Sequence, residues 1–208
     1  MINIQDANFN ISLDEFVSFY FKLVNKNLNH LGQHSKNVQM VAELIAENLN
    51  VKLPERLILK YGALLHDVGK TFVPGDILNA SRNLTSVEFE IVKTHTMFGW
   101  EVLNSFSCIP AEMKMLALMH HYRNGYGYPK GSVHKISMNI LLIDILTIAD
   151  SFAAIMEPRV YKKPLNEIQA FLVINDPDND RNAGLSCEVL DVLKYLIDNK
   201  KIILSDFF

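Results

Sequence analysis

The amino-acid sequence predicts an all-α fold, a single-domain helical bundle that encloses one hydrophobic core. Apolar residues recur at intervals of three and four along most of the 208 residues, which is the period of one face of an α-helix. Hydrophobic residues make up 49% of the chain and charged residues 21%, a balance typical of a globular protein. No internal repeat, low-complexity tract or linker divides the chain into separate bundles.

Helical periodicity marks the segments 12–24, 27–49, 54–67, 85–106, 110–121, 137–157 and 187–199. Ser12 with Glu15 and Thr85 with Glu88 are expected to form capping boxes, in which the paired side chains satisfy backbone amides at the start of a helix. Pro110 suits the first turn of its helix because its φ angle is already helical.

Loops are expected at 71–84, 122–136 and 175–185. The second of these contains the stretch YRNGYGYPKG at 122–131. Its density of glycine and proline predicts a shaped loop rather than a strand.

Composition and charge exclude several classes of protein. The apolar segment at 136–156 contains Asp144 and Asp150, each of which costs about 2.5–3.5 kcal/mol near the centre of a bilayer, so we expect a buried helix and no membrane span. A net charge of −3 argues against binding to nucleic-acid polymers or anionic membranes. Cys108 and Cys187 are the only cysteines, and with no secretory signal visible we expect two free thiols in the cytoplasm.

The stretch LLHDVGK at 64–70 places charged and polar side chains in an otherwise apolar segment. Adjacent residues of a helix do not share a face, so His66 and Asp67 are not an ordinary surface ion pair. Burying them requires partners that offset the loss of hydration. A metal ion with further ligands from other parts of the chain would be such a partner.

Other histidines and aspartates fall on the apolar faces of predicted helices. His34 is in register with an apolar stripe of its helix, and His30 extends that stripe by one turn. His95, His120 and Asp150 are in register with apolar residues of three later helices. One such histidine is usually an ordinary hydrogen-bonded core residue, but five segments that bury unpartnered groups are costly unless the groups converge.

A convergent set of this kind predicts a metal centre. Imidazole and carboxylate ligands suit iron, manganese, cobalt or zinc, and the lack of cysteine ligands argues against a structural zinc site. Two or more ions that share a bridging carboxylate form a hydrolytic centre that activates water and binds phosphate oxygens.

Taken together and in this order, the motifs resemble the HD-GYP family of the HD-superfamily metal-dependent phosphohydrolases. The resemblance runs from about residue 27 to residue 200 and rests on HSKNV (34–38), LLHDVGK (64–70), PGDIL (74–78), Leu84-Thr85 with Glu88, His95, His120-His121, GYGYP (125–129), AD (149–150) and RVY (159–161). It implies an HD-GYP-like domain over residues 27–208, preceded by an N-terminal helical extension over 1–26. It also implies a helical bundle around two or three divalent ions, iron or manganese.

The resemblance further implies a role for each matching residue. The metal ligands would be His34, His66, Asp67, His95, His120, His121 and Asp150, with Asp67 bridging two ions. Asp67 and Lys70 would be the catalytic residues, and Lys70, Arg159 and Lys162 would contact the substrate. The loop residues Gly127, Tyr128 and Pro129 would contact partners, such as a diguanylate cyclase domain or an upstream sensor protein.

The sequence departs from the family's pattern at several positions. Members with three metals carry a Glu one turn before the first ligand His, where this chain has His30, so we expect two ions, with His30 a weak or indirect ligand. Tyr122 and Asn124 replace a Glu and an Asp, the loop is one residue shorter, and Ala153-Ala154 replaces an Asp-Ala pair. These changes leave the ligands intact and concern substrate positioning and partner docking.

The functional prediction is a cytoplasmic, metal-dependent phosphodiesterase that hydrolyses cyclic di-GMP to pGpG, to GMP or to both. One alternative is a phosphohydrolase for another nucleotide, such as cyclic GMP-AMP, which the altered residues 122–124 leave open. The other is a non-hydrolytic signalling module that binds cyclic di-GMP, or a cyclase through the GYP loop. The complete ligand set argues against the module, because binding alone does not need it.

Overall fold

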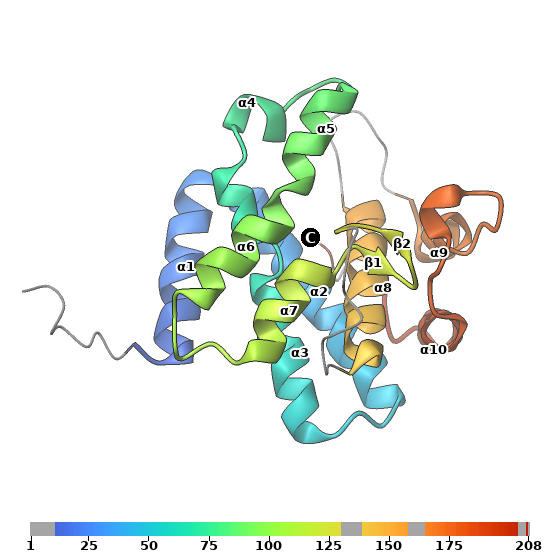
Figure 1. Ribbon diagram of the computed structural model, residues 1–208. Helices are drawn as coiled ribbons and strands as arrows, with labels where there is room; N and C mark the ends of the chain where they lie inside the picture. The colour runs from blue at the N-terminus through green and yellow to red at the C-terminus, as the bar shows by residue number, and fades with distance from the viewer. Residues whose placement is uncertain (1–10, 130–138, 158–164, 204–206, 208) are drawn as a thin grey trace, which may run out of the picture.

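The computed structural model describes residues 11–129, 139–157, 165–203 and 207, and these residues are mostly helical (Figure 1). The α-helices are α1 (Leu13–Asn27), α2 (Asn29–Asn48), α3 (Leu53–Leu65), α4 (Gly75–Leu78), α5 (Ser86–Lys93), α6 (His95–Asn104), α7 (Ala111–Met119), α8 (Ile140–Met156), α9 (Glu167–Ile174) and α10 (Cys187–Asp198). Short 3-10 helices cover Val68–Phe72 and Asp180–Asn182, and β1 (Tyr122–Arg123) pairs with β2 (Tyr126–Gly127). The all-α prediction is confirmed.

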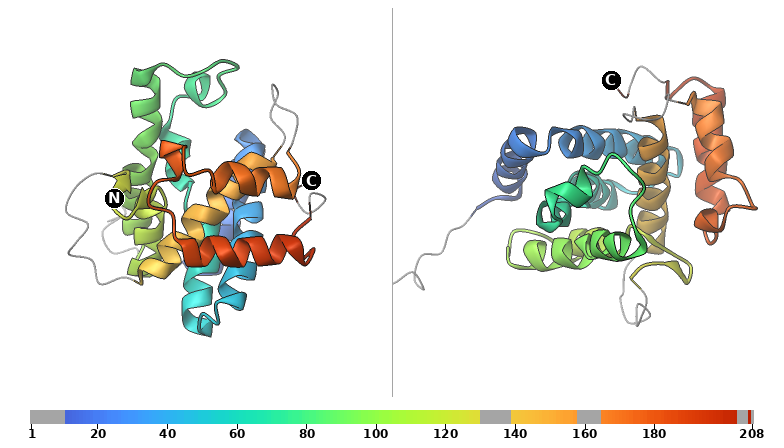
Figure 2. Two further views of the ribbon diagram at one scale, coloured as in Figure 1. Left: turned by 90° about the vertical axis from the view of Figure 1, so that its right-hand side faces the viewer. Right: turned by 90° about the horizontal axis from the view of Figure 1, so that it is seen from above.

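The bundle is organised around α8. Helix α2 packs against both α3 and α8, while α6 packs against α7 and the 3-10 turn at Val68–Phe72. Figure 2 shows α9 and α10 on one side of α8, with the other helices on the opposite side. Helix α8 is therefore covered on both sides, which explains why its sequence is apolar nearly all round.

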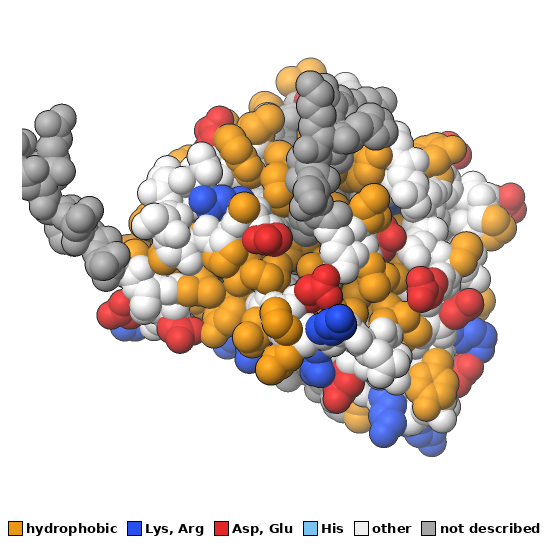
Figure 3. Space-filling model, turned by 60° about the horizontal axis from the view of Figure 1, so that its bottom comes forward, with side chains coloured by type: hydrophobic (Ala, Val, Ile, Leu, Met, Phe, Trp, Pro, Cys, Tyr) orange, Lys and Arg blue, Asp and Glu red, His pale blue; other side chains and the backbone are white. Residues whose placement is uncertain are grey.

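The surface agrees with the modest net charge of the chain. On the face shown in Figure 3, acidic and basic side chains of the described residues are interspersed with apolar ones. This face has no broad basic patch of the kind that binds nucleic-acid polymers. Among the residues that the structure describes, none of the helices combines the length and the hydropathy that a membrane span requires.

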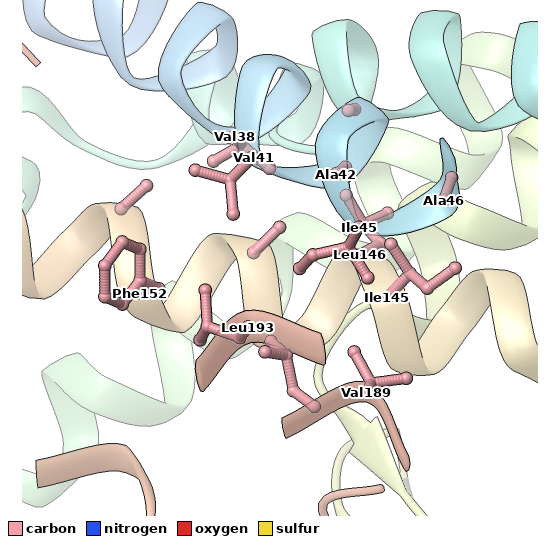
Figure 4. Close-up of a cluster of buried hydrophobic side chains, with 14 of the residues drawn as sticks. Val38, Val41, Ala42, Ile45, Ala46, Ile145, Leu146, Phe152, Val189 and Leu193 are labelled. Carbon is pink, nitrogen blue, oxygen red and sulfur yellow. The ribbon is translucent and has the colours of Figure 1, made fainter. Parts of the chain in front are cut away.

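The larger hydrophobic core lies between α2, α8 and α10. Figure 4 shows Val41 and Ile45 of α2, Leu146 and Phe152 of α8 and Leu193 of α10 in this core, and each of them is fully buried. A second cluster joins α1 to α3, α6 and α7. The two clusters fix the spacing of the helices that carry the histidines and aspartates of the candidate site.

Several local predictions are confirmed. Ser12 with Glu15 and Thr85 with Glu88 form complete capping boxes at the starts of α1 and α5. Both cysteines are free thiols. Helix α9 was not predicted, although it begins with a capping box of Asn166 and Gln169 and buries three apolar residues.

The prediction of one helix over 85–106 is wrong, because the chain breaks at Thr94 into α5 and α6. The Thr94 hydroxyl donates to the carbonyl oxygen of Ile91, and the His95 ring donates to that of Val92, both at 2.6 Å. In an unbroken helix these carbonyls would accept the amides four residues later. The Thr94 amide also donates to the Ile91 carbonyl oxygen, at 3.1 Å. These side-chain and backbone contacts replace the ladder locally, and His95 begins a new helix.

The prediction of a loop without strands at 122–131 is also wrong. Tyr122 pairs with Gly127 and Arg123 pairs with Tyr126 in a two-residue antiparallel ladder. Asn124 and Gly125, with φ angles of 45° and 94°, form the turn between the strands. An Asn-Gly pair favours this turn because both of its residues adopt positive φ at low cost.

Gly69 allows the 3-10 turn after α3 to pass directly over α6. A Cβ atom on Gly69 would lie 1.9 Å from the carbonyl oxygen of His95 and 2.5 Å from the amide nitrogen of Gly99. Both are backbone atoms of α6, which cannot shift without distorting the helix. Because Gly69 has no side chain, the turn next to Asp67 and Lys70 can pack directly against the helix that begins with His95.

We expect Gly69→Ala to lower the free energy of unfolding by about 1–3 kcal/mol, the usual cost of overpacking a close contact. The control is Gly75→Ala, because a Cβ atom there would meet only the Asn79 side chain, at 3.8 Å. Urea unfolding followed by circular dichroism gives both values. Equal stability of the two variants would contradict the proposed role of Gly69.

Candidate metal centre

Three histidines lie at helix boundaries and share one hydrogen-bonding pattern. His66 follows α3, His95 is the first residue of α6, and His120 follows α7. The Nδ1 atom of each ring donates to the carbonyl oxygen three residues earlier, in Ala63, Val92 and Ala117, at 2.8, 2.6 and 2.9 Å. Carbonyls near a helix end lack amide partners, so the imidazoles satisfy them. In the neutral form of each ring, Nε2 is then an unprotonated acceptor.

The Nε2 atoms of these rings meet in the interior. The Nε2 atoms of His95 and His120 are 3.1 Å apart, and Nε2 of His66 is buried without a hydrogen-bond partner. Burial lowers the pKa of His95, and burial together with the neighbouring histidines lowers that of His120 further. Neutral rings leave two acceptors facing each other, an arrangement that a cation between them stabilises. This donor set fits a metal ion.

Asp67 lies between two groups of histidines. Its Oδ1 atom is 3.4 Å from Nε2 of His95 and 3.7 Å from Nε2 of His120. Its Oδ2 atom is 3.3 Å from Nε2 of His66 and 3.8 Å from Nε2 of His34. The side chain is 1% exposed, and Oδ1 has no hydrogen-bond partner. Burial alone would raise the pKa of Asp67, but interactions with His66 and with the Lys70 ammonium outweigh it and hold the pKa well below its usual range.

The group on the Oδ2 side is completed by α2 and α8. His34 Nε2 is 2.9 Å from Oδ1 of Asp150, and His66 Nε2 is 3.8 Å from the same oxygen. Burial opposes a charge on His34, but hydrogen bonds to Asp150 and Glu157 outweigh it and raise the pKa of His34 to about 10. The proton that His34 shares with Asp150 is one that a divalent cation displaces on binding.

All seven ligands implied by the sequence resemblance come together at this site. Their ligand atoms form three groups, each within 4.8 Å: His95, His120 and His121; His34, His66 and Asp150; His66, Asp67 and His120. These groups could hold divalent metal ions. His121 completes the first group, and burial lowers its pKa to about 3, which keeps the ring neutral.

The other residues predicted to act at the centre are Lys70, His30, Arg159 and Lys162, and none of them belongs to the three ligand groups found among the described residues. Lys70 Nζ lies 2.5 Å from Oδ2 of Asp67, brought there by the 3-10 turn rather than by a continued α-helix. His30 is exposed and belongs to none of the three groups, but partial burial and the nearby charge of Lys70 lower its pKa. Arg159 and Lys162 lie outside the described residues.

The GYP loop packs directly on His121. A Cβ atom on Gly127, whose φ is 77°, would lie 1.9 Å from the carbonyl oxygen of His121. The Tyr128 amide donates to that oxygen at 3.2 Å, and the Tyr128 ring lies 4.6 Å from the His121 ring, centroid to centroid. Burial raises the pKa of the Tyr128 hydroxyl, and the charge of Asp150 adds to this effect. The loop therefore forms part of the wall of the centre.

Two further residues contact the site, although the sequence analysis gave them no role. Glu157, at the end of α8, places Oε1 and Oε2 each 3.1 Å from Nδ1 of His34. Thr147 donates to the carbonyl oxygen of His120 at 2.7 Å. The signal that could have identified Glu157 is its spacing of seven residues from Asp150, which places both on one face of α8.

Known proteins resemble this chain in sequence and in fold. A protein-family model described as HD domain matches residues 19–182. The chain is 34% identical over 168 residues to a cyclic di-GMP phosphodiesterase of Thermotoga maritima. The matched region covers 76% of this chain and 45% of that protein. It is 28% identical over 182 residues to the 3'3'-cGAMP-specific phosphodiesterase 3 of Vibrio cholerae. This match covers 85% of this chain and 39% of that protein. The chain thus spans less than half the length of these relatives.

A solved structure has the same arrangement of helices. The HDG"Y"P protein Bd1817 of Bdellovibrio bacteriovorus matches with a TM-score of 0.66 and 15% identity, over 89% of this chain and 63% of that chain. The residues matched by the family model include the whole histidine and aspartate cluster. The chain therefore belongs to the HD domain family and, within it, to the HD-GYP family.

Proposed function

We propose that this chain is a metal-dependent cyclic dinucleotide phosphodiesterase that hydrolyses cyclic di-GMP to pGpG, to GMP or to both. The observation that carries the proposal is the placement of Asp67, whose two oxygens face two separate groups of histidines. A carboxylate in this position suits a centre of two ions, which is a recurrent arrangement in phosphoester hydrolysis. The activities named for the Thermotoga and Vibrio relatives support a cyclic dinucleotide as the substrate class.

Two divalent ions, iron or manganese, would occupy the two groups. His34, His66, Asp150 and Oδ2 of Asp67 would hold one ion, and His95, His120, His121 and Oδ1 of Asp67 would hold the other. Imidazole and carboxylate donors without thiolates support iron or manganese. When bound, the ions supply activation of a water molecule and neutralisation of the phosphate charge. The exposure of His30, outside the groups, supports two ions rather than three.

The protein side chains would hold the charges of the reaction in place. Asp67 stays ionised, and its hydrogen bond to Lys70 keeps the ammonium group beside the centre. That positive charge is placed to bind a phosphate oxygen and to stabilise the charge that develops on the leaving oxygen. Arg159 and Lys162, which follow α8 in the sequence, are proposed to hold the second phosphate or a guanine edge.

A second candidate substrate is cyclic GMP-AMP. One relative is named as specific for this compound, and Tyr122 and Asn124 differ from the HD-GYP pattern beside the centre. The loop residues Gly127, Tyr128 and Pro129 remain the proposed contact for a cyclase domain or a sensor protein, and the preceding residue Tyr126 is exposed. We further propose that the protein works in the cytoplasm, where its free thiols would remain reduced.

The proposed function is tested with anaerobically purified protein loaded with iron or manganese and assayed against a panel of cyclic dinucleotides. We expect hydrolysis of cyclic di-GMP by the wild type and background rates for Asp67→Ala. The variant should also lose bound metal, because two cations without the shared carboxylate repel each other. Asp144→Ala, which removes a half-buried carboxyl of α8 outside the three groups, is the control and should retain both properties. Normal hydrolysis by Asp67→Ala would refute the proposal.

Lys70→Ala separates metal binding from catalysis. We expect normal metal content but a loss of about 2–4 kcal/mol of transition-state stabilisation, because one charged contact to the phosphate is removed. Lys194→Ala, which breaks a lysine–aspartate pair on the surface of α10, is the matched control. Metal analysis with steady-state kinetics gives both quantities. Wild-type kinetics in Lys70→Ala would show that the substrate does not contact this residue.

His30→Ala tests the number of ions. Because His30 is exposed and lies outside the three groups, the variant should bind two ions per chain, as should the wild type. Metal content per chain together with anomalous scattering from crystals measures the number and positions of the ions. Three full-occupancy ions in the wild type, with two in His30→Ala, would instead make His30 a ligand.

A further inference from the structure

We propose that Glu157 is a positioning residue that holds the His34 ring in its metal-binding orientation and so sets the affinity of the group formed by His34, His66 and Asp150. The inference rests on the proposed metal-dependent function and extends it to a residue at the end of α8. Glu157 itself stays outside the three ligand groups. Its role is exerted through the imidazole that it contacts.

His34 differs from the other histidines in its place along the helix. His66, His95 and His120 lie at helix boundaries, where each Nδ1 atom finds a backbone carbonyl three residues earlier. His34 lies within α2, where the backbone carbonyls are already engaged by the helical ladder. A side chain from another helix must therefore orient this ring, and Glu157 supplies two oxygens at 3.1 Å from Nδ1.

The carboxylate of Glu157 is itself fixed. Asn37, which is buried, donates from Nδ2 to Oε1 of Glu157 at 2.8 Å. Gln33 in turn donates to Oδ1 of Asn37 at 3.0 Å. The hydrogen-bonded series therefore runs from Gln33 of α2 through Asn37 and Glu157 back to His34 of α2. A carboxylate held by a buried amide cannot rotate away from His34 without leaving that amide unpaired.

The two nitrogens of His34 are consequently held from one helix. Nδ1 contacts Glu157, and Nε2 contacts Oδ1 of Asp150 at 2.9 Å. Asp150 lies in α8, and Glu157 is the residue that directly follows this helix. A carboxylate on the outer nitrogen of a ligand histidine fixes its tautomer and increases the basicity of the inner nitrogen. Helix α8 thus provides one ligand and orients another.

The test measures binding of Mn²⁺ to metal-free protein, by titration calorimetry and by the electron paramagnetic resonance signal of free Mn²⁺, without any substrate. We expect two ions per wild-type chain. In Glu157→Ala one of the two should bind about 10–100-fold more weakly, the usual effect of removing such a partner. Glu157→Gln keeps an acceptor for Nδ1 and should recover part of that affinity. Glu43→Ala, which removes a carboxylate on α2 that also accepts from an amide side chain, should change neither ion.

The possible results separate this inference from the proposed function. No Mn²⁺ binding by the wild type would refute the metal-dependent function, and with it the role of Glu157. Two ions in the wild type and unchanged affinities in Glu157→Ala would refute the role of Glu157 alone. Equal weakening of both ions, with a lower unfolding temperature and no recovery in Glu157→Gln, would show that Glu157 only stabilises the fold.

Discussion

The burial of the Asp67 carboxylate is the constraint on which the rest of the structure depends. An ionised carboxylate removed from water is costly unless positive charge and hydrogen bonds surround it. Lys70 contacts one oxygen, while the other has no hydrogen-bond partner and faces unprotonated imidazole nitrogens. The fold therefore concentrates negative charge and lone pairs at one point, and a bound cation resolves the imbalance. The same arrangement that is unfavourable for an empty core is favourable for a hydrolytic centre.

Interruptions of the helices produce this arrangement. At His66, His95 and His120 a helix ends or breaks, and the ring that follows satisfies a carbonyl which has lost its amide partner. The same hydrogen bond therefore satisfies the end of the helix and orients the histidine ring toward the centre. Gly69 and Gly127 complete the arrangement, because each allows one backbone segment to lie directly against the carbonyl of a histidine. The rings of His66, His95 and His120 are each held by a backbone carbonyl, which leaves them little freedom to reorient.

The hydrophobic core positions the remaining ligands. Helices α2 and α8 pack through fully buried aliphatic side chains (Figure 4), and this packing brings His34 to Asp150 and Glu157. Because the core excludes water, contacts between charged groups at its edge are stronger than they would be on the surface. Substitutions in this core should therefore affect the group containing His34 even though they touch no ligand.

The sequence by itself determined the helical class and the two capping boxes, which follow from local periodicity and from pairs three residues apart. The family and the seven residues that converge were implied by the resemblance of the motifs to the HD-GYP family. Only the tertiary structure decided the break at Thr94, the Asn-Gly hairpin contacts with His121, the exposure of His30 and the contact between His34 and Glu157. Periodicity cannot reveal that a side chain will capture a carbonyl from the helical ladder. Nor can it show which residues meet across 123 positions of sequence, because packing of α2 against α8 brings them together.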